Sequence, residues 1–329
     1  MSRLREMKVE IEEWPLVRPF VISRSSELIA TVVVVSLREG SASGWGESTP
    51  YERYDETPAS VVQAIELCRD ALESDPHITA AKLGLHGAAA NAVDCALVDL
   101  ASKRAKKPAW ELLKQQQPKP LLTTATLVLG EPASMAAEAA QYPEFKLLKV
   151  KLGAGGDDIA KIEAIRRARP DARLICDANE GWSVDQLKEY ATPLARLGVE
   201  MIEQPCPAGK DEGLRGLKLP VLLCADESCH VAADVAGLVG KYDLVNIKLD
   251  KAGGITGSLA LAEEAKRRDM GIMVGCMLAT SLAIAPGVIA GQHARYVDLD
   301  GPLALTNDRS HRISYAGGEV FPASPELWG

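Results

Sequence analysis

The chain has 329 residues, 47% hydrophobic and 25% charged, which is the balance of a globular protein long enough for one large and one smaller domain. Its formal net charge of −8 disfavours nucleic acids and anionic membranes as partners, because both select a basic surface. No stretch approaches the roughly 20 uninterrupted apolar residues of a transmembrane helix, and the charged N-terminal segment lacks the apolar core of a secretory signal.

The seven cysteines are odd in number and form no CxxC pair. Several lie inside apolar runs, such as Cys176 in RLICDAN and Cys224 in VLLCADE. Buried, reduced thiols in a reducing compartment explain this pattern better than a disulfide framework. We therefore expect a cytoplasmic protein.

The first 118 residues predict an α+β domain. The segments MKVEIEEW (7–14) and TVVVVSL (31–37) are rich in β-branched residues and predict strands. The segment GAAANAVDCALVDLASKRAKK (87–107) is rich in alanine, has apolar residues at helical spacing and ends with basic residues, which favours a helix. Strands followed by helices are typical of an α+β module.

Residues 119–300 predict a parallel barrel. Eight short apolar runs recur at intervals of roughly 20 to 28 residues, and most of the gaps between them carry a helical pattern. Eight parallel strand–helix units favour a modified (β/α)8 barrel of the (β/α)7β kind over an open sheet. The runs are 124–130, 146–153, 173–179, 201–205, 221–227, 244–250, 271–277 and 296–300.

Two other folds fit the spacing less well. A doubly wound sheet would bind dinucleotides through a GxGxxG motif after its first strand, and the chain has none there. A solenoid would repeat a consensus, which these runs lack. Between the fourth and fifth runs, the Gly- and Pro-rich connection 205–220 predicts only a short helix. Residues 301–329, rich in Gly, Pro and Ser, are expected to return to the small domain.

Charged residues interrupt the second halves of these otherwise apolar strands. Barrel strands are buried on both faces, and their carboxyl ends form the active-site face, so recurring charges there indicate a functional site. Pairs two residues apart lie on one side of a strand. Taken alone, each pair also fits an exposed strand. The charged positions are Lys149, Lys151, Asp177, Glu203, Asp226, Lys248, Asp250, Asp298 and Asp300.

Asp177, Glu203 and Asp226 come from three consecutive strands. Three converging carboxylates repel one another unless a cation neutralises them. An all-oxygen set suits a hard divalent ion, and Mg²⁺ is the usual ion where substrate oxygens complete its shell. We expect one Mg²⁺ per subunit. The alternative is separate ion pairs or helix caps, a role open to Asp177.

Lys151 and Lys248 come from strands on either side of these acids. In a closed barrel they would face each other across a bound substrate, as inversion at carbon requires of two bases. One lysine would remove a proton, and the other would deliver one to the opposite face. We expect burial and the cationic neighbours, Lys149 and the metal, to lower the pKa of both lysines toward neutrality.

The motifs KLLKVKL (146–152), DAN (177–179), EQP (203–205), ADES (225–228) and NIKLDKAGG (246–254) together resemble the muconate-lactonising subgroup of the enolase superfamily. The resemblance spans the whole chain and implies a capping α+β domain on a modified barrel. It also implies Mg²⁺-assisted proton abstraction beside a carboxylate through an enediolate.

The segment DLDGP (298–302) is similar to the aspartate pair with which dipeptide epimerases hold the ammonium of their substrate. PFVISR (19–24), TPYERY (49–54) and GCMLATS (275–281) are most similar to the epimerases of L-Ala-D/L-Glu, which the resemblance ties to murein peptide recycling. Arg24 would then lie on a mobile capping loop and pair with the glutamate side chain, since a guanidinium binds a carboxylate bidentately.

The same resemblance implies further roles. Thr126 and Lys149 would contact the substrate carboxylate region, while Cys276 and Leu278 would line the pocket. It also implies that Lys151 serves the D substrate and Lys248 the L substrate. Ser228 and Asp250 are supporting candidates.

Four alternatives stay open: an N-acylamino-acid racemase or cycloisomerase, a dipeptide epimerase with another side-chain preference, a non-catalytic metal-binding barrel, and a single-base lyase. The presence of both Lys151 and Lys248 argues against the last two alternatives, and the presence of Asp298 and Asp300 argues against the first. Homo-oligomerisation is left open by the sequence.

Overall fold

The computed structural model describes residues 4–153 and 156–329. Its N-terminal part is an antiparallel sheet of β1 (Glu6–Val21), β2 (Ser26–Glu39) and β3 (Ala42–Ser48), in that order. The helices that follow are α1 (Pro58–Glu66), α2 (Arg69–Ser74), α3 (Gly87–Ala105) and α4 (Ala109–Leu112). A Cβ at Gly44 or Gly46 would lie within 2.3 Å of the α3 backbone, so glycine lets β3 and α3 approach closely.

The larger part is a parallel sheet of eight strands in chain order. The first and last strands, β5 and β12, meet through side chains: Thr124 Oγ1 donates to Asp298 Oδ1 at 2.6 Å, and the Leu299 N–H donates to Thr123 Oγ1 at 3.0 Å. The sheet is therefore a nearly closed barrel, and the predicted fold class is confirmed. Its strands are β5 (Thr124–Leu127), β6 (Leu147–Lys151), β7 (Arg173–Asp177), β8 (Val199–Glu203), β9 (Leu222–Ala225), β10 (Leu244–Lys248), β11 (Gly271–Gly275) and β12 (Tyr296–Asp298).

Helices connect most of these strands: α5 (Pro132–Ala139), α6 (Asp158–Ala168), α7 (Val184–Arg196), α8 (Val235–Leu238), α9 (Leu249–Ala252), α10 (Ile255–Arg267) and α11 (Ser281–Ala290). Between β8 and β9 the expected short helix is reduced to one 3₁₀ turn, Glu212–Leu214. Three prolines and three glycines in this connection explain the difference, because both residue types disfavour a helix interior.

The C-terminal segment crosses the molecule. Strands β13 (Tyr315–Ala316) and β14 (Glu319–Val320) form a small sheet with β4 (Leu121–Leu122). The last residues reach α3, where Trp328 Nε1 donates to the Cys95 carbonyl at 3.1 Å and the Gly329 N–H donates to Asp99 at 2.7 Å.

The division of the chain at 118/119 and 300/301 stays a prediction. No helix in the described part of the chain is long and apolar enough to cross a bilayer.

The barrel interior is layered along each strand. A buried apolar layer of Leu147, Ile175, Met201, Cys224, Leu244, Met273 and Tyr296 fills one end. Because strand side chains alternate, the lumen position two residues further along is polar or charged in most of these strands. The second layer contains Lys149, Asp177, Glu203, Asp226, Asn246 and Asp298. All seven cysteines are free thiols, as expected.

Candidate active site

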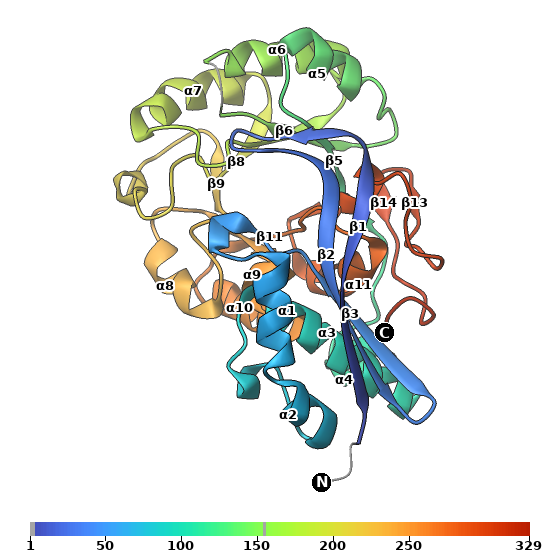
Figure 1. Ribbon diagram of the computed structural model, residues 1–329. Coiled ribbons are helices and arrows are strands. Elements are labelled where there is room, and N and C mark those ends of the chain that lie inside the picture. The colour runs from blue at the N-terminus through green and yellow to red at the C-terminus, as the bar shows by residue number, and fades with distance from the viewer. Residues whose placement is uncertain (1–3, 154–155) are drawn as a thin grey trace.

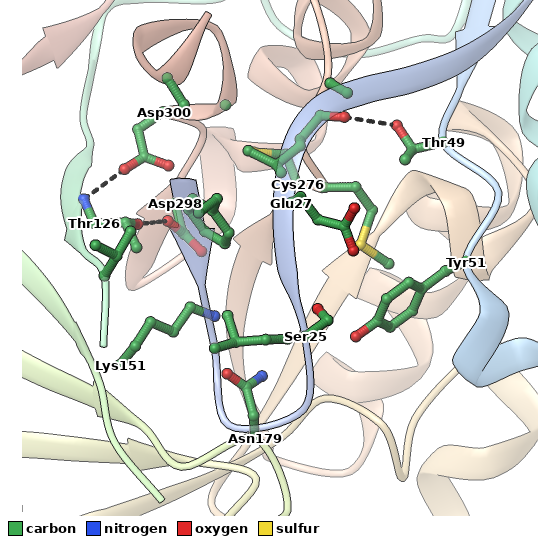
Figure 2. A pocket seen from close by; sticks show the side chains of 18 of the residues that line it. Ser25, Glu27, Thr49, Tyr51, Thr126, Lys151, Asn179, Cys276, Asp298 and Asp300 are labelled. Carbon is green, nitrogen blue, oxygen red and sulfur yellow. Dashed lines mark hydrogen bonds between the residues drawn. The ribbon is translucent and has the colours of Figure 1, made fainter. Parts of the chain in front are cut away.

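A cavity of about 580 Å³ lies between the carboxyl ends of the barrel strands and the β1–β2 hairpin. The hairpin reaches from the N-terminal sheet across the barrel face (Figure 1). In Figure 2 it runs between Lys151, Asp298 and Asp300 on one side and Thr49 and Tyr51 on the other. The predicted site residues that line the cavity are Arg24, Thr126, Lys149, Lys151, Asp226, Lys248, Cys276, Leu278, Asp298 and Asp300.

The three predicted metal ligands stand side by side, fully buried. Asp177 is the register partner of both Lys151 on β6 and Glu203 on β8, and Asp226 follows the end of β9. Asp177 also accepts the Asn179 N–H at 2.9 Å, but it does not cap α7, whose N-cap is Ser183. The carboxylates are thus neighbours at one level of the barrel.

In this structure the carboxylates hold lysine ammonium groups. Lys149 Nζ lies 2.7 Å from Asp298 Oδ2, 2.7 Å from Glu203 Oε2 and 3.2 Å from Asp177 Oδ2. Lys151 Nζ donates to Asp177 Oδ2 at 2.7 Å. With this arrangement the described residues contain no group of three His, Cys, Asp or Glu side chains gathered closely enough for a metal ion.

The donor set nevertheless fits a hard cation. Burial, followed by repulsion from Asp177, raises the pKa of Glu203 to about 7, so this buried carboxylate is kept charged at a cost that a cation would reduce. Two buried oxygens beside the carboxylates, Asn246 Oδ1 and Asn179 Oδ1, make no hydrogen bond within the described part of the chain. Buried oxygen atoms without a hydrogen-bond donor suit a hard divalent cation or a water molecule bound to it.

The lysine pKa values differ from the expectation. Burial lowers the pKa of Lys248, but the Asp226 and Glu203 carboxylates outweigh burial, so the pKa is raised well above its usual value. The pKa of Lys149 is also raised well above its usual value, because the carboxylates around it, Asp298 first, outweigh burial. The nearest neighbours of Lys248 are anions, and the expected lowering included the charge of the metal, so it stays a prediction for the metal-bound protein. Lys248 Nζ lies 2.7 Å from Asp226 Oδ2.

Asp298 and Asp300 lie together at the seam of the barrel. Asp298 Oδ1 accepts from Thr124 Oγ1 at 2.6 Å and from Thr126 Oγ1 at 3.3 Å, and Lys149 donates to its other oxygen. Asp300 Oδ2 accepts the Thr126 N–H at 2.6 Å (Figure 2). Burial, then repulsion from Asp298, raises the pKa of Asp300 to about 7. Two carboxylates this close form a natural site for a cationic group.

Arg24 lies in the turn between β1 and β2, and both of its terminal nitrogens donate to the protein. Its Nη1 donates to the Asn179 carbonyl and to Glu180 Oε2, both at 2.8 Å. Its Nη2 donates to Glu227 Oε1 at 2.8 Å and to the Tyr51 hydroxyl at 3.0 Å. Sequence reasoning missed these partners, although Glu180 and Glu227 follow shortly after strand ends, as the other site carboxylates do.

The two supporting candidates do not line the cavity. Asp250 Oδ1 accepts the Thr49 N–H at 2.9 Å and Asn91 Nδ2 at 2.8 Å, which fastens the loop after β3 and helix α3 to the barrel. Ser228 donates to Asp211 at 2.7 Å and accepts from Gln204 at 2.9 Å. Both side chains therefore brace loops around the site.

Comparisons with known proteins identify the family. Residues 4–114 match the N-terminal domain of the mandelate racemase / muconate lactonizing enzyme family, and residues 133–321 match the enolase C-terminal domain-like family. An L-Ala-D/L-Glu epimerase of Escherichia coli (strain K12) is 43% identical over 323 residues, covering 96% of this chain and 99% of that protein. The chain belongs to the enolase superfamily.

Other members of the superfamily that resemble this chain differ in their ligands. An N-acetyl-D-glutamate racemase of Pseudoalteromonas sp. is 41% identical over 306 residues, 91% of this chain and 95% of that protein. An enolase family member from Agrobacterium tumefaciens with homology to dipeptide epimerases, solved with sodium and L-Ala-L-Glu, superimposes with a TM-score of 0.95 at 45% identity, covering 99% of this chain and 100% of that one.

Magnesium is present in a further superfamily structure. A dipeptide epimerase from Enterococcus faecalis V583, complexed with Mg and L-Leu-L-Tyr, superimposes with a TM-score of 0.92 at 28% identity, covering 99% of each chain. The names of these superfamily relatives, epimerase and racemase, confirm the expectation of an isomerase.

Proposed function

We propose that this superfamily member epimerises dipeptides at the α-carbon of the C-terminal residue, with L-Ala-D-Glu and L-Ala-L-Glu as substrates. One observation carries the proposal: Lys151 and Lys248 line the same cavity from β6 and β10, and the carboxylates of β7 to β9 lie between these strands. Two opposed bases are what inversion needs. The relatives named as epimerases of L-Ala-D/L-Glu support the choice of substrate.

Each residue has a role in this proposal. One lysine takes the α-proton, and the other returns a proton to the opposite face of the planar carbon. Asp298 and Asp300 bind the ammonium of the N-terminal residue, beside Thr126. Lys149 contacts the substrate carboxylate region, Cys276 and Leu278 line the pocket, and Arg24 faces the glutamate side chain.

Asp177, Glu203 and Asp226 would hold Mg²⁺ in the active protein. When bound, the ion supplies positive charge against the substrate carboxylate, where negative charge develops as the proton leaves. Exchanging lysine contacts for the ion would also weaken the pull of these anions on Lys248, and so favour its neutral, basic form.

N-acylamino-acid racemisation is the second candidate, because one relative is an N-acetyl-D-glutamate racemase. The two candidates differ in whether the substrate presents an ammonium group. The paired acids at 298 and 300 favour the dipeptide, since an N-acyl group offers them no positive charge. The cytoplasmic location and the role in murein peptide recycling stay predictions.

Deuterium exchange tests the proposal. With L-Ala-L-Glu and Mg²⁺ in D₂O, we expect the α-proton signal of glutamate to disappear while signals of L-Ala-D-Glu appear in the NMR spectrum. N-acetyl-L-glutamate should exchange at least about tenfold more slowly, the effect of one lost charged hydrogen bond. Faster exchange with N-acetylglutamate would assign the chain to the second candidate, and no exchange with either substrate would refute both.

Replacing Arg24 by methionine tests the side-chain site. The change removes the cavity-lining arginine that pairs with Glu227 and keeps an apolar stem of similar length. We expect kcat/KM for L-Ala-L-Glu to fall by about 10- to 100-fold, and that for L-Ala-L-Ala to change little. Steady-state kinetics on both dipeptides measure this. An equal loss on both would mean that Arg24 only holds the hairpin in place.

A further inference from the structure

Arg24 has little donor capacity left for a substrate. A guanidinium has five N–H groups, and the four on Nη1 and Nη2 are used by Asn179, Glu180, Tyr51 and Glu227. Only the Nε–H has no acceptor among the described residues. A glutamate side chain therefore meets an arginine that cannot bind it bidentately unless Arg24 first releases protein partners.

The charge of Arg24 is also neutralised. Glu227 and Glu180 each lie 2.8 Å from its Nη atoms, and their side chains are only 1% and 7% exposed. Arg53 makes a bidentate contact with Glu180, with both distances 2.8 Å. Two arginines and two glutamates sum to zero charge. A third carboxylate entering this set would bring an unbalanced negative charge into a partly buried site, which is unfavourable.

Glu227 and both arginines of this set line the cavity, whereas Glu180 does not. The second Glu227 oxygen, Oε2, is buried and makes no hydrogen bond within the described part of the chain. The side-chain end of the cavity thus combines a spare N–H donor with an Arg24 whose charge is already balanced. Such a surface does not discriminate strongly between a carboxylate and an uncharged carboxamide, which both donates and accepts.

We infer that Glu227, supported by Glu180, sets the side-chain selectivity of the cavity by neutralising Arg24, so that dipeptides ending in glutamine are substrates alongside those ending in glutamate. The inference rests on the proposed dipeptide epimerisation and extends its substrate class from acidic to amide side chains. Glu227 acts through Arg24 and is in this sense a specificity-determining residue.

Kinetics on three dipeptides test the inference in the wild-type protein. L-Ala-L-Glu, L-Ala-L-Gln and L-Ala-L-Met have side chains of similar length that are anionic, polar and apolar. We expect α-proton exchange in D₂O with L-Ala-L-Gln to be within about tenfold of that with L-Ala-L-Glu and clearly faster than with L-Ala-L-Met. Exchange with L-Ala-L-Glu alone would overturn the inference and leave the proposed function standing, whereas no exchange with any of the three would refute the function itself.

Glu227→Gln gives the decisive comparison. Removing the negative charge beside Arg24 should raise the ratio of kcat/KM for L-Ala-L-Glu over L-Ala-L-Gln by about tenfold, because the arginine then attracts the substrate carboxylate unopposed. Glu180→Gln should raise the same kcat/KM ratio. This second variant still tests the inference if Glu227→Gln does not fold. A lowered or unchanged ratio in the folded variants would overturn the inference, because it would mean that the glutamates merely support Arg24.

Glu200→Gln is the matched control. Glu200 also pairs with an arginine, Arg173, at 2.7 Å, but it lies near the start of β8, at the opposite end of the barrel from the cavity. The same substitution there removes one charge from an Arg–Glu pair without touching the cavity. The kcat/KM ratio of Glu200→Gln for L-Ala-L-Glu over L-Ala-L-Gln should equal that of the wild type. A shift as large as that of Glu227→Gln would show a general effect of charge and would overturn the inference.

Discussion

Replacing either Lys151 or Lys248 by alanine is expected to abolish epimerisation and to leave proton exchange with one epimer only. This is the expected result of two bases that serve opposite faces of the α-carbon, since a surviving lysine can still remove and return a proton on its own face. Following the family resemblance, Lys151→Ala should exchange only L-Ala-L-Glu, and Lys248→Ala only L-Ala-D-Glu. The loss of turnover should be on the order of a thousandfold or more.

NMR in D₂O with each pure epimer measures this exchange. Lys188→Ala is a suitable control, because Lys188 is an exposed lysine on α7 that pairs with Asp185. A single-base enzyme would behave differently: one variant would lose all exchange, and the other would keep exchange with both epimers. That pattern would falsify the two-base mechanism.

Removal of divalent metal is expected to have an effect of similar size. Dialysis against EDTA should lower turnover of L-Ala-L-Glu by a factor on the order of a thousand, and added Mg²⁺ should restore it, because several kcal/mol of charge stabilisation would be lost. Asp226→Asn should bind Mg²⁺ more weakly by calorimetry and should not be rescued at Mg²⁺ concentrations that saturate the wild type.

A second readout separates metal binding from catalysis. Mg²⁺ should raise the thermal unfolding temperature of the wild type, because it relieves repulsion among buried carboxylates, and should raise that of Asp226→Asn much less. Full turnover after exhaustive EDTA treatment would rule out the metal site. Activity with another divalent ion would not, since the carboxylates can accept several hard cations.

The barrel was predictable because its signals are local. Each strand is a short apolar run, and the charges that end it, such as Lys151, Asp177 and Lys248, lie at its carboxyl end both in the sequence and in the structure. Strand order followed from the alternation with helices. The observed strand ends differ from the predicted ones by only a few residues. For example, the predicted run 201–205 corresponds to β8 (Val199–Glu203).

The contacts of Arg24 and the charge state of the lysines were not predictable in this way. Arg24 meets Glu180 and Glu227, which are 156 and 203 residues further along the chain, and no local pattern links them. The raised pKa of Lys149 depends on three carboxylates from β7, β8 and β12 around one ammonium. Both features arise from where loops and strand ends converge, which the order of residues alone does not specify.

The seam between β5 and β12 limits how a barrel of this kind can evolve. Asp298 joins the two strands through Thr124 and Thr126, and it also pairs with Lys149, so one carboxylate closes the barrel and faces the cavity. A lineage that drifted toward substrates without an ammonium group could lose Asp300 at the expense of its hydrogen bonding to Thr126 alone. Loss of Asp298 would remove its bonds to both threonines and to Lys149, so Asp300 is the acid expected to change first.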